Sequence, residues 1–195
     1  MKNRVCFVGG GNMAHAMIAG MVADGFEAQN IIVIERNLSK RDYLVNKYGV
    51  QVSSSSKDTL LTTDIVVLAI KPQQMARLVL DIKDLVAANQ LIITVAAGVE
   101  ISLYYKLFSK NVAIARVMPN TPSSLGFGVS GVFFTSTVSS KQKHFVVSIL
   151  KSIGIVEVVE KETDINIVAA CSGSGTAYYL QFMEHMVNST VSRGL

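Results

Sequence analysis

The first half of this 195-residue chain alternates short, nearly continuous apolar runs with amphipathic stretches. Continuous runs rich in Val and Ile are typical of strands covered on both faces, whereas the stretches between them have helical spacing. The predicted strands are residues 5–8, 31–34, 65–69, 91–95 and 112–117, and the predicted helices are residues 12–23, 39–47, 57–62, 73–80 and 101–108. Strand and helix in this alternation predict a parallel sheet with right-handed crossovers.

The second half begins with a predicted loop, rich in Pro, Ser and Gly, over residues 119–131. A helix near residues 141–152 and a strand at 155–158 are expected to complete the same sheet. Residues 162–170 look helical, Ser172-Gly173-Ser174-Gly175 is expected to interrupt that helix, and residues 176–191 predict one long helix. We therefore expect a sheet domain followed by a helical segment.

Composition narrows the class of protein. Half of the residues are hydrophobic and 16% are charged, which favours a large core over disorder. The net charge of +4 suits either nucleic acid or a phosphate-bearing cofactor, and no basic stripe with interleaved aromatics favours the former. Cys6 and Cys171 indicate neither a disulfide framework nor a metal site. We expect a cytoplasmic protein without signal peptide, membrane span or bound metal.

The strongest local motif is Gly9-Gly10-Gly11-Asn12-Met13-Ala14, which follows a predicted strand and opens a predicted helix. Gly9, Gly11 and Ala14 fit the pattern G-x-G-x-x-G/A, in which small residues allow a tight turn, close approach of the pyrophosphate and close helix packing. Free N–H groups and the helix dipole at this point favour a phosphate. The motif predicts dinucleotide binding, and the alternative is a glycine-rich turn that binds nothing.

The end of the second predicted strand governs the choice of cofactor. An acidic residue there usually binds the adenine ribose hydroxyls, whereas a nearby Arg accepts a 2′-phosphate. This chain has both, in Glu35-Arg36-Asn37, with Lys40 and Arg41 just beyond. The three cations favour NADP(H) over NAD(H), unless they only form the solvated start of a helix.

Other strand ends carry weaker signals. Lys71 and Pro72 follow the strand at 65–69, and small residues follow the strand at 91–95, where a flat ring would fit. Between Pro119 and Pro122, a stiff loop presents Asn120 and Thr121. Residues 172–175 form a possible second anion site before a long helix. Taken alone, each segment has a structural alternative: a surface lysine, a tight turn, a rigid loop or a helix cap.

Few acid–base groups fall in these loops, because His15, His144 and His185 all lie in predicted helices. A site with a cofactor and few titratable groups suits hydride transfer, in which the nicotinamide carries the chemistry and the protein supplies orientation.

Taken in order, five segments resemble those of pyrroline-5-carboxylate reductases. They are FVGGGNMA at residues 7–14, AIKPQ at 69–73, AAGV at 96–99, RVMPNTP at 116–122 and SGSGTAY at 172–178. The resemblance implies an α/β fold: a Rossmann-type, doubly wound parallel sheet over residues 1–160, followed over 161–195 by the beginning of an all-helical dimerisation domain. It implies reduction of 1-pyrroline-5-carboxylate to L-proline with NADP(H), or alternatively NAD(H), in a homodimer or higher homo-oligomer.

The same resemblance assigns site residues. Those expected at the cofactor are Val8, Gly9, Gly10, Gly11, Asn12, Met13, Arg36, Asn37, Ser56, Ala69, Ile70, Lys71, Pro72, Val95, Ala96 and Ala97, and those expected near the substrate are Asn120, Thr121 and Ser174. No catalytic side chain is assigned.

Two departures from the family pattern stand out. Thr176 replaces the proline of SGSGPAY, and a small effect is expected because threonine is tolerated in the first turn of a helix. A later Ser-Pro-Gly-Gly segment, which in the family grips the substrate carboxylate, has no counterpart, so the helical domain is expected to be truncated. A catalytically incomplete NADP-binding fragment or degenerate paralogue is the alternative. A different imine or β-hydroxyacid reductase is disfavoured by the MPNTP and SGSG segments.

Overall fold

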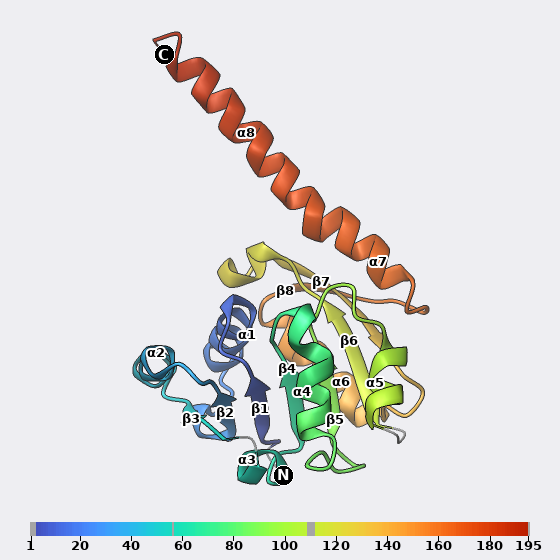
Figure 1. The fold of residues 1–195 in the computed structure, drawn as a ribbon. Helices are drawn as coiled ribbons and strands as arrows, with labels where there is room; N and C mark the ends of the chain where they lie inside the picture. Colours follow the sequence, from blue (N-terminus) through green and yellow to red (C-terminus); the bar gives the residue numbers. More distant parts are fainter. Residues whose placement is uncertain (1–2, 56, 109–111, 195) are drawn as a thin grey trace.

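The structure is a computed structural model that describes residues 3–55, 57–108 and 112–194. Within these residues one eight-stranded sheet has the order β3-β2-β1-β4-β5-β6-β7-β8 (Figure 1). The strands are β1 (Val5–Val8), β2 (Ile31–Ile34), β3 (Gln51–Ser53), β4 (Ile65–Leu68), β5 (Leu91–Thr94), β6 (Ala113–Met118), β7 (Gly128–Phe134) and β8 (Gly154–Val158). The strands β1 to β6 pair in parallel, so the expected doubly wound sheet is confirmed.

Helices cover both faces of the sheet. The α-helices are α1 (Asn12–Ala23), α2 (Leu38–Tyr48), α3 (Lys57–Leu61), α4 (Met75–Ile82), α5 (Ile101–Phe108), α6 (Ser140–Lys151), α7 (Asp164–Val168) and α8 (Gly175–Val191). Shorter helical segments are η1 (Ala28–Asn30), η2 (Pro72–Gln74), η3 (Thr121–Leu125) and the π-helical η4 (Ala169–Ser174). Helices α1, α2 and α6 share one buried core with the sheet, and α3, α4 and α5 share the other.

The strands form where the sequence places continuous apolar runs. All four residues of β1, β2, β4 and β5 are buried, which requires apolar side chains on both faces. The helices end as their sequences indicate. Gly25 has φ 86° just after α1, and the Asn37 side chain accepts a hydrogen bond from the Lys40 N–H at the start of α2.

The loop predicted over residues 119–131 is wrong at its end, where residues 128–131 belong to a strand. Strand β7 begins at Gly128 and pairs antiparallel with β6, so the sheet is not wholly parallel. Its glycines reflect close approach of neighbours, because a Cβ on Gly131 would lie 2.8 Å from a methyl group of Val168. Strand β3 was also not predicted, since it is a short edge strand without a buried apolar run.

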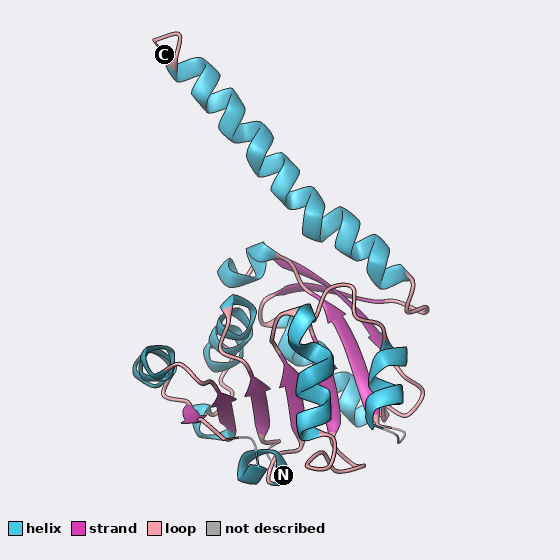
Figure 2. Cartoon of the chain, in the orientation of Figure 1, coloured by secondary structure: helices cyan, strands magenta, loops and turns pink. Residues whose placement is uncertain are grey.

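The predicted interruption of the last helices is wrong as well. Residues 164–191 form one continuous helical rod that projects from the sheet domain, with a π-helical segment at η4 (Figure 2). The backbones of Val168, Ala169, Ser174 and Gly175 are all right-handed helical. Ser172 to Gly175 therefore lie inside a helix, and so does Thr176. Among the described residues, no helix has the length and apolar content that a membrane crossing requires.

Candidate active site

The candidate site lies where the strand order reverses, between β1 and β4. In open α/β sheets, ligands bind at the carboxyl ends of the strands beside this switch point. The loops that follow β1, β4 and β5 gather there, carrying residues 9–11, 69–72 and 95–97. The Ala69 N–H donates to the Val8 carbonyl at 2.9 Å, and the Val95 N–H donates to the Leu68 carbonyl at 3.4 Å. The structure thus brings together the three loops that the sequence assigns to the cofactor.

The glycine loop has the geometry expected of a pyrophosphate-binding turn. Gly9 has φ 102°, and a Cβ there would lie 2.7 Å from the Ala69 carbonyl oxygen. Gly11 is the N-terminal cap residue of α1, and a Cβ on it would find only that same oxygen, at 3.9 Å. Ala14 is fully buried, which allows the helix to pack closely on the sheet.

The first turn of α1 is open to an anion. No side chain caps this helix, and its first turn carries no acidic residue. The helix N-terminus therefore offers N–H groups and a favourable dipole to a phosphate. Asn12 and Met13 form this turn, and their position fits the pyrophosphate of a dinucleotide.

The end of β2 contributes an anion and a cation. The carboxylate of Glu35 accepts hydrogen bonds from the N–H groups of Gly10 at 3.1 Å and Asn37 at 3.0 Å. Arg36 is exposed, and its side chain forms no ion pair within the described part of the chain. The Asn37 side chain caps α2. Ser56, expected on the adenosine side, lies outside the described residues.

The side expected to hold the nicotinamide is formed by the loops after β4 and β5. Lys71 is the exposed N-terminal cap of η2, and Pro72 is its first residue, as expected. In the loop after β5, Ala96 is buried and Ala97 is exposed. The Ala96 N–H donates to the Thr94 hydroxyl at 3.4 Å, and that hydroxyl shares a 2.6 Å hydrogen bond with the Tyr104 hydroxyl.

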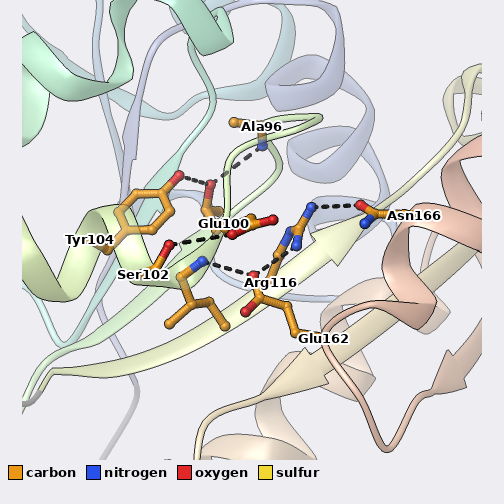
Figure 3. Close-up of polar contacts among 9 residues, drawn as sticks. Ala96, Glu100, Ser102, Tyr104, Arg116, Glu162 and Asn166 are labelled. Carbon is orange, nitrogen blue, oxygen red and sulfur yellow. Dashed lines mark hydrogen bonds and ion pairs between the residues drawn. The ribbon is translucent and has the colours of Figure 1, made fainter.

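A buried polar cluster lies next to this loop and includes Tyr104, Arg116 and Glu162 (Figure 3). The Arg116 side chain, 3% exposed, forms a 2.7 Å ion pair with Oε1 of Glu162 and donates to the Asn166 amide oxygen at 3.2 Å. The same Glu162 oxygen accepts from the Ile101 N–H at 2.8 Å. One carboxylate therefore joins β6, the start of α5 and the segment that leads into α7.

Tyr104 stays neutral within this cluster. Burial raises the pKa of its hydroxyl to about 12, although the hydrogen bond with Thr94 acts in the opposite direction. A neutral hydroxyl can donate to Thr94, which in turn accepts from Ala96. The Tyr104 and Thr94 hydroxyls thus hold the start of the loop after β5 through the Ala96 N–H.

The residues expected near the substrate are placed unequally. The Asn120 side chain is buried. It accepts a hydrogen bond from the Val129 N–H at 2.9 Å and donates one to the Ser172 carbonyl at 3.2 Å, so it links η4 to β7. Thr121 and Ser174 are exposed. The anion site considered at residues 172–175 is wrong, because these residues are not at a helix start. The Gly175 N–H, for example, bonds to the Ala170 carbonyl.

Few titratable side chains approach the site. His15 lies on α1 between the rings of Tyr43 and Tyr48, and burial, together with the charges of Lys47 and Lys40, lowers its pKa. His144 contacts the Ser140 carbonyl on α6, and His185 is exposed on α8. Within the described residues, no group of three His, Cys, Asp or Glu side chains could hold a metal ion.

Comparison with known proteins decides the family. The family model described as "NADP oxidoreductase coenzyme F420-dependent" matches residues 4–98. A pyrroline-5-carboxylate reductase of Vibrio alginolyticus is 36% identical over 191 residues, which cover 98% of this chain and 70% of that protein. The chain belongs to the pyrroline-5-carboxylate reductase family.

Solved structures agree with this assignment. A pyrroline-5-carboxylate reductase from Coxiella burnetii superposes with a TM-score of 0.92 at 37% identity, covering 100% of this chain and 73% of that one. A pyrroline carboxylate reductase from Plasmodium falciparum, solved with NADP bound, has a TM-score of 0.86 at 27% identity, covering 100% of this chain and 72% of that one. The resemblance and the fold predicted from the motifs are thereby confirmed.

Two features of the site were not predicted from the sequence. One is the contact of Glu35 with Gly10, and the other is the pairing of Arg116 with Glu162. Arg116 sits within an otherwise apolar strand, opposite Thr94 of β5, and a charge in that setting is the available signal of a buried ion pair. Nothing in the local sequence identifies its partner, 46 positions away.

Proposed function

We propose that this chain reduces 1-pyrroline-5-carboxylate to L-proline with NADPH, and that NADH is an alternative cofactor. The observation that carries the proposal is the junction of the glycine loop with the loops after β4 and β5, in a chain of this family. The glycine loop and the open N-terminus of α1 suit the pyrophosphate, and Arg36 is free for a 2′-phosphate. The small residues after β5 leave room for a flat ring.

When bound, the reduced nicotinamide would supply the hydride that adds to the imine carbon of the substrate. Residues 69–72 and 95–97 would hold the ring between them and exclude water from one of its faces. The imine nitrogen gains one proton, taken from water or already present on the bound substrate. Rate enhancement then comes from contact between the two reacting carbon atoms, and no covalent intermediate with a side chain is needed.

The direct test is consumption of NADPH by the purified chain, with and without 1-pyrroline-5-carboxylate, beside a titration of NADPH binding by fluorescence. We expect consumption that depends on the imine. Binding without consumption would instead support the alternative, a dinucleotide-binding module without turnover. Absence of binding would contradict both.

We further propose that residues 1–160 form the cofactor domain and that residues 161–195 belong to a helical domain that joins two copies of the chain. Helix α8 buries no residue of its own, and many of its apolar side chains are exposed. They are Tyr178, Tyr179, Leu180, Phe182, Met183, Met186, Val187 and Val191. Large exposed apolar surfaces mark association sites. A cytoplasmic location is proposed as well, in keeping with the free thiols of Cys6 and Cys171.

A further inference from the structure

Both ends of the loop after β5 are fastened by hydrogen bonds. At its start, the Ala96 N–H donates to the Thr94 hydroxyl at 3.4 Å, and that hydroxyl shares a 2.6 Å hydrogen bond with Tyr104 of α5. At its end, the N–H of Ile101, the first residue of α5, donates to Oε1 of Glu162 at 2.8 Å. The loop expected to face the nicotinamide is therefore positioned by α5 and by Glu162 (Figure 3).

Glu162 reaches this loop from a distant part of the chain. It precedes α7, in the segment assigned to the helical domain, and lies 61 positions from Ile101. Arg116, whose side chain is 3% exposed, contacts the same Oε1 at 2.7 Å and also donates to Asn166 of α7 at 3.2 Å. The carboxylate therefore cannot move away without giving up hydrogen bonds to both β6 and the start of α5.

The adenosine half of the candidate site has no such link. It lies at the ends of β1 and β2, and β4 separates these strands from β5. Among the described residues, the hydrogen bonds of the Glu162 carboxylate go to Arg116 and Ile101, neither of which belongs to the glycine loop or to the end of β2. A displacement of Glu162 should therefore affect the nicotinamide half of a bound dinucleotide and not its adenosine half.

We propose that Glu162 is a positioning residue: by holding the start of α5, it sets the loop after β5 against the nicotinamide ring and so couples the helical segment to that half of the site. The inference rests on the proposed function, since it requires a dinucleotide at the glycine loop. It differs from a purely structural role. A carboxylate that only stabilised the fold would leave the balance between the two halves of the dinucleotide unchanged in any variant that stays folded.

The test compares the binding of NADPH with that of adenosine 2′,5′-bisphosphate, which has the adenosine half of NADPH and no nicotinamide. Calorimetric titration gives both dissociation constants, and the fluorescence of the reduced nicotinamide reports on the surroundings of its ring. The variants are Glu162→Ala and Glu162→Asp. Glu162→Asp keeps a charge for Arg116 but is one methylene too short to hold Arg116 and the Ile101 N–H together, so the test stands even where Glu162→Ala is unstable.

Two control variants separate positioning from charge and from stability. Glu160→Gln removes an exposed negative charge from the same segment. Val146→Ala lowers the stability of the fold through the core on the opposite face of the sheet, where Val146 is fully buried. Circular dichroism establishes that each variant is folded, and urea unfolding measures its stability.

We expect the NADPH dissociation constant to rise on the order of tenfold in both Glu162 variants, the size of one hydrogen bond to a charged group. The dissociation constant of the bisphosphate should stay within about twofold of its wild-type value. The fluorescence of bound NADPH should shift toward that of free NADPH, and both controls should bind the two ligands as the wild type does.

Equal changes for the two ligands, or an unchanged NADPH affinity, would overturn the proposal and leave the proposed function intact. A nicotinamide fluorescence that stays the same when NADPH binds to the wild-type chain would also overturn it. A wild-type chain that binds neither ligand would overturn the proposed function as well.

Discussion

At the scale of single residues, the site depends on how closely two loops approach each other. Gly9 combines a positive φ of 102° with a contact in which a Cβ would lie 2.7 Å from the Ala69 carbonyl oxygen and 2.8 Å from a methyl group of Ile70. Gly25 also has a positive φ, of 86°, but a Cβ there would meet nothing within 4 Å. A substitution at Gly25 would therefore meet backbone strain alone, whereas a substitution at Gly9 would meet both backbone strain and steric crowding.

Gly9→Ala should reduce both stability and NADPH affinity. Gly25→Ala should cost about 1–2 kcal/mol from backbone strain alone, with NADPH affinity unchanged. In Gly9→Ala the loops after β1 and β4 must also move apart, so the loss of stability should be larger and NADPH affinity should fall at least about tenfold. Urea unfolding and fluorescence titration measure the two effects. Equal behaviour of the two variants would contradict the role assigned to close packing.

Tyr104 gives the fold a dependence on alkaline pH. Because its pKa is raised from 10.0 to about 12 in the folded state, its neutral form stabilises the fold fully below pH 10, and that contribution is lost as the pH rises toward 12. Tyr104→Phe should cost about 1 kcal/mol at neutral pH, for the lost hydrogen bond with Thr94. Its free energy of unfolding should then fall less steeply than that of the wild type above pH 10. Parallel pH profiles from urea unfolding would refute this.

At the scale of elements, patterns that depend on burial were predictable and those that depend on distant contacts were not. Continuous apolar runs located β1, β2, β4 and β5, because both of their faces are covered. Strand β7 begins in a Gly- and Ser-rich stretch, and its glycines are explained only by neighbours such as Val168. The helix through residues 172–175 likewise makes a distant contact, because the Asn120 amide donates to the Ser172 carbonyl.

The candidate site likewise has features that could be predicted from the sequence and features that could not. Strand ends locate the three loops in sequence, and the rule for parallel sheets places them at one edge. The contact between Glu35 and Gly10 is a matter of side-chain direction, which a strand boundary does not determine. Asn120 was expected near the substrate, whereas its amide is occupied by Val129 and Ser172.

The ion pair between Arg116 and Glu162 should hold α7 on the sheet. Glu162→Ala leaves a buried guanidinium without its carboxylate and frees the Ile101 N–H, so the free energy of unfolding should fall by about 3 kcal/mol. Amide hydrogen exchange in α7 should become faster. The control is Arg77→Gln, which breaks the exposed pair with Asp81 and should cost less than about 1 kcal/mol. Similar costs for the two variants would show that the buried pair does not anchor α7.

At the scale of the whole molecule, the sheet domain presents the cofactor edge and α8 projects away from it (Figure 1). The two parts differ in how their apolar side chains are used: the sheet domain buries them in two cores, whereas α8 exposes them. This difference supports the proposal that α8 is covered when copies of the chain associate.

Phe182→Glu should therefore weaken association of the chain. A charge placed among exposed apolar side chains of α8 opposes burial of that face, and light scattering after size-exclusion chromatography should show a smaller species. Asn188→Glu is the control on the same helix, because it replaces an exposed polar residue and should leave the mass unchanged. A wild-type chain that is monomeric at all concentrations would contradict the proposed role of α8.

The most direct test of the central claim follows the hydride itself. The chain would be incubated with 1-pyrroline-5-carboxylate and NADPH deuterated at C4 of the nicotinamide, on the face from which hydride leaves, and the product examined by mass spectrometry. The account predicts L-proline carrying one deuterium, on the ring carbon that was the imine carbon. Unlabelled proline, or no proline from a chain that binds NADPH, would contradict it.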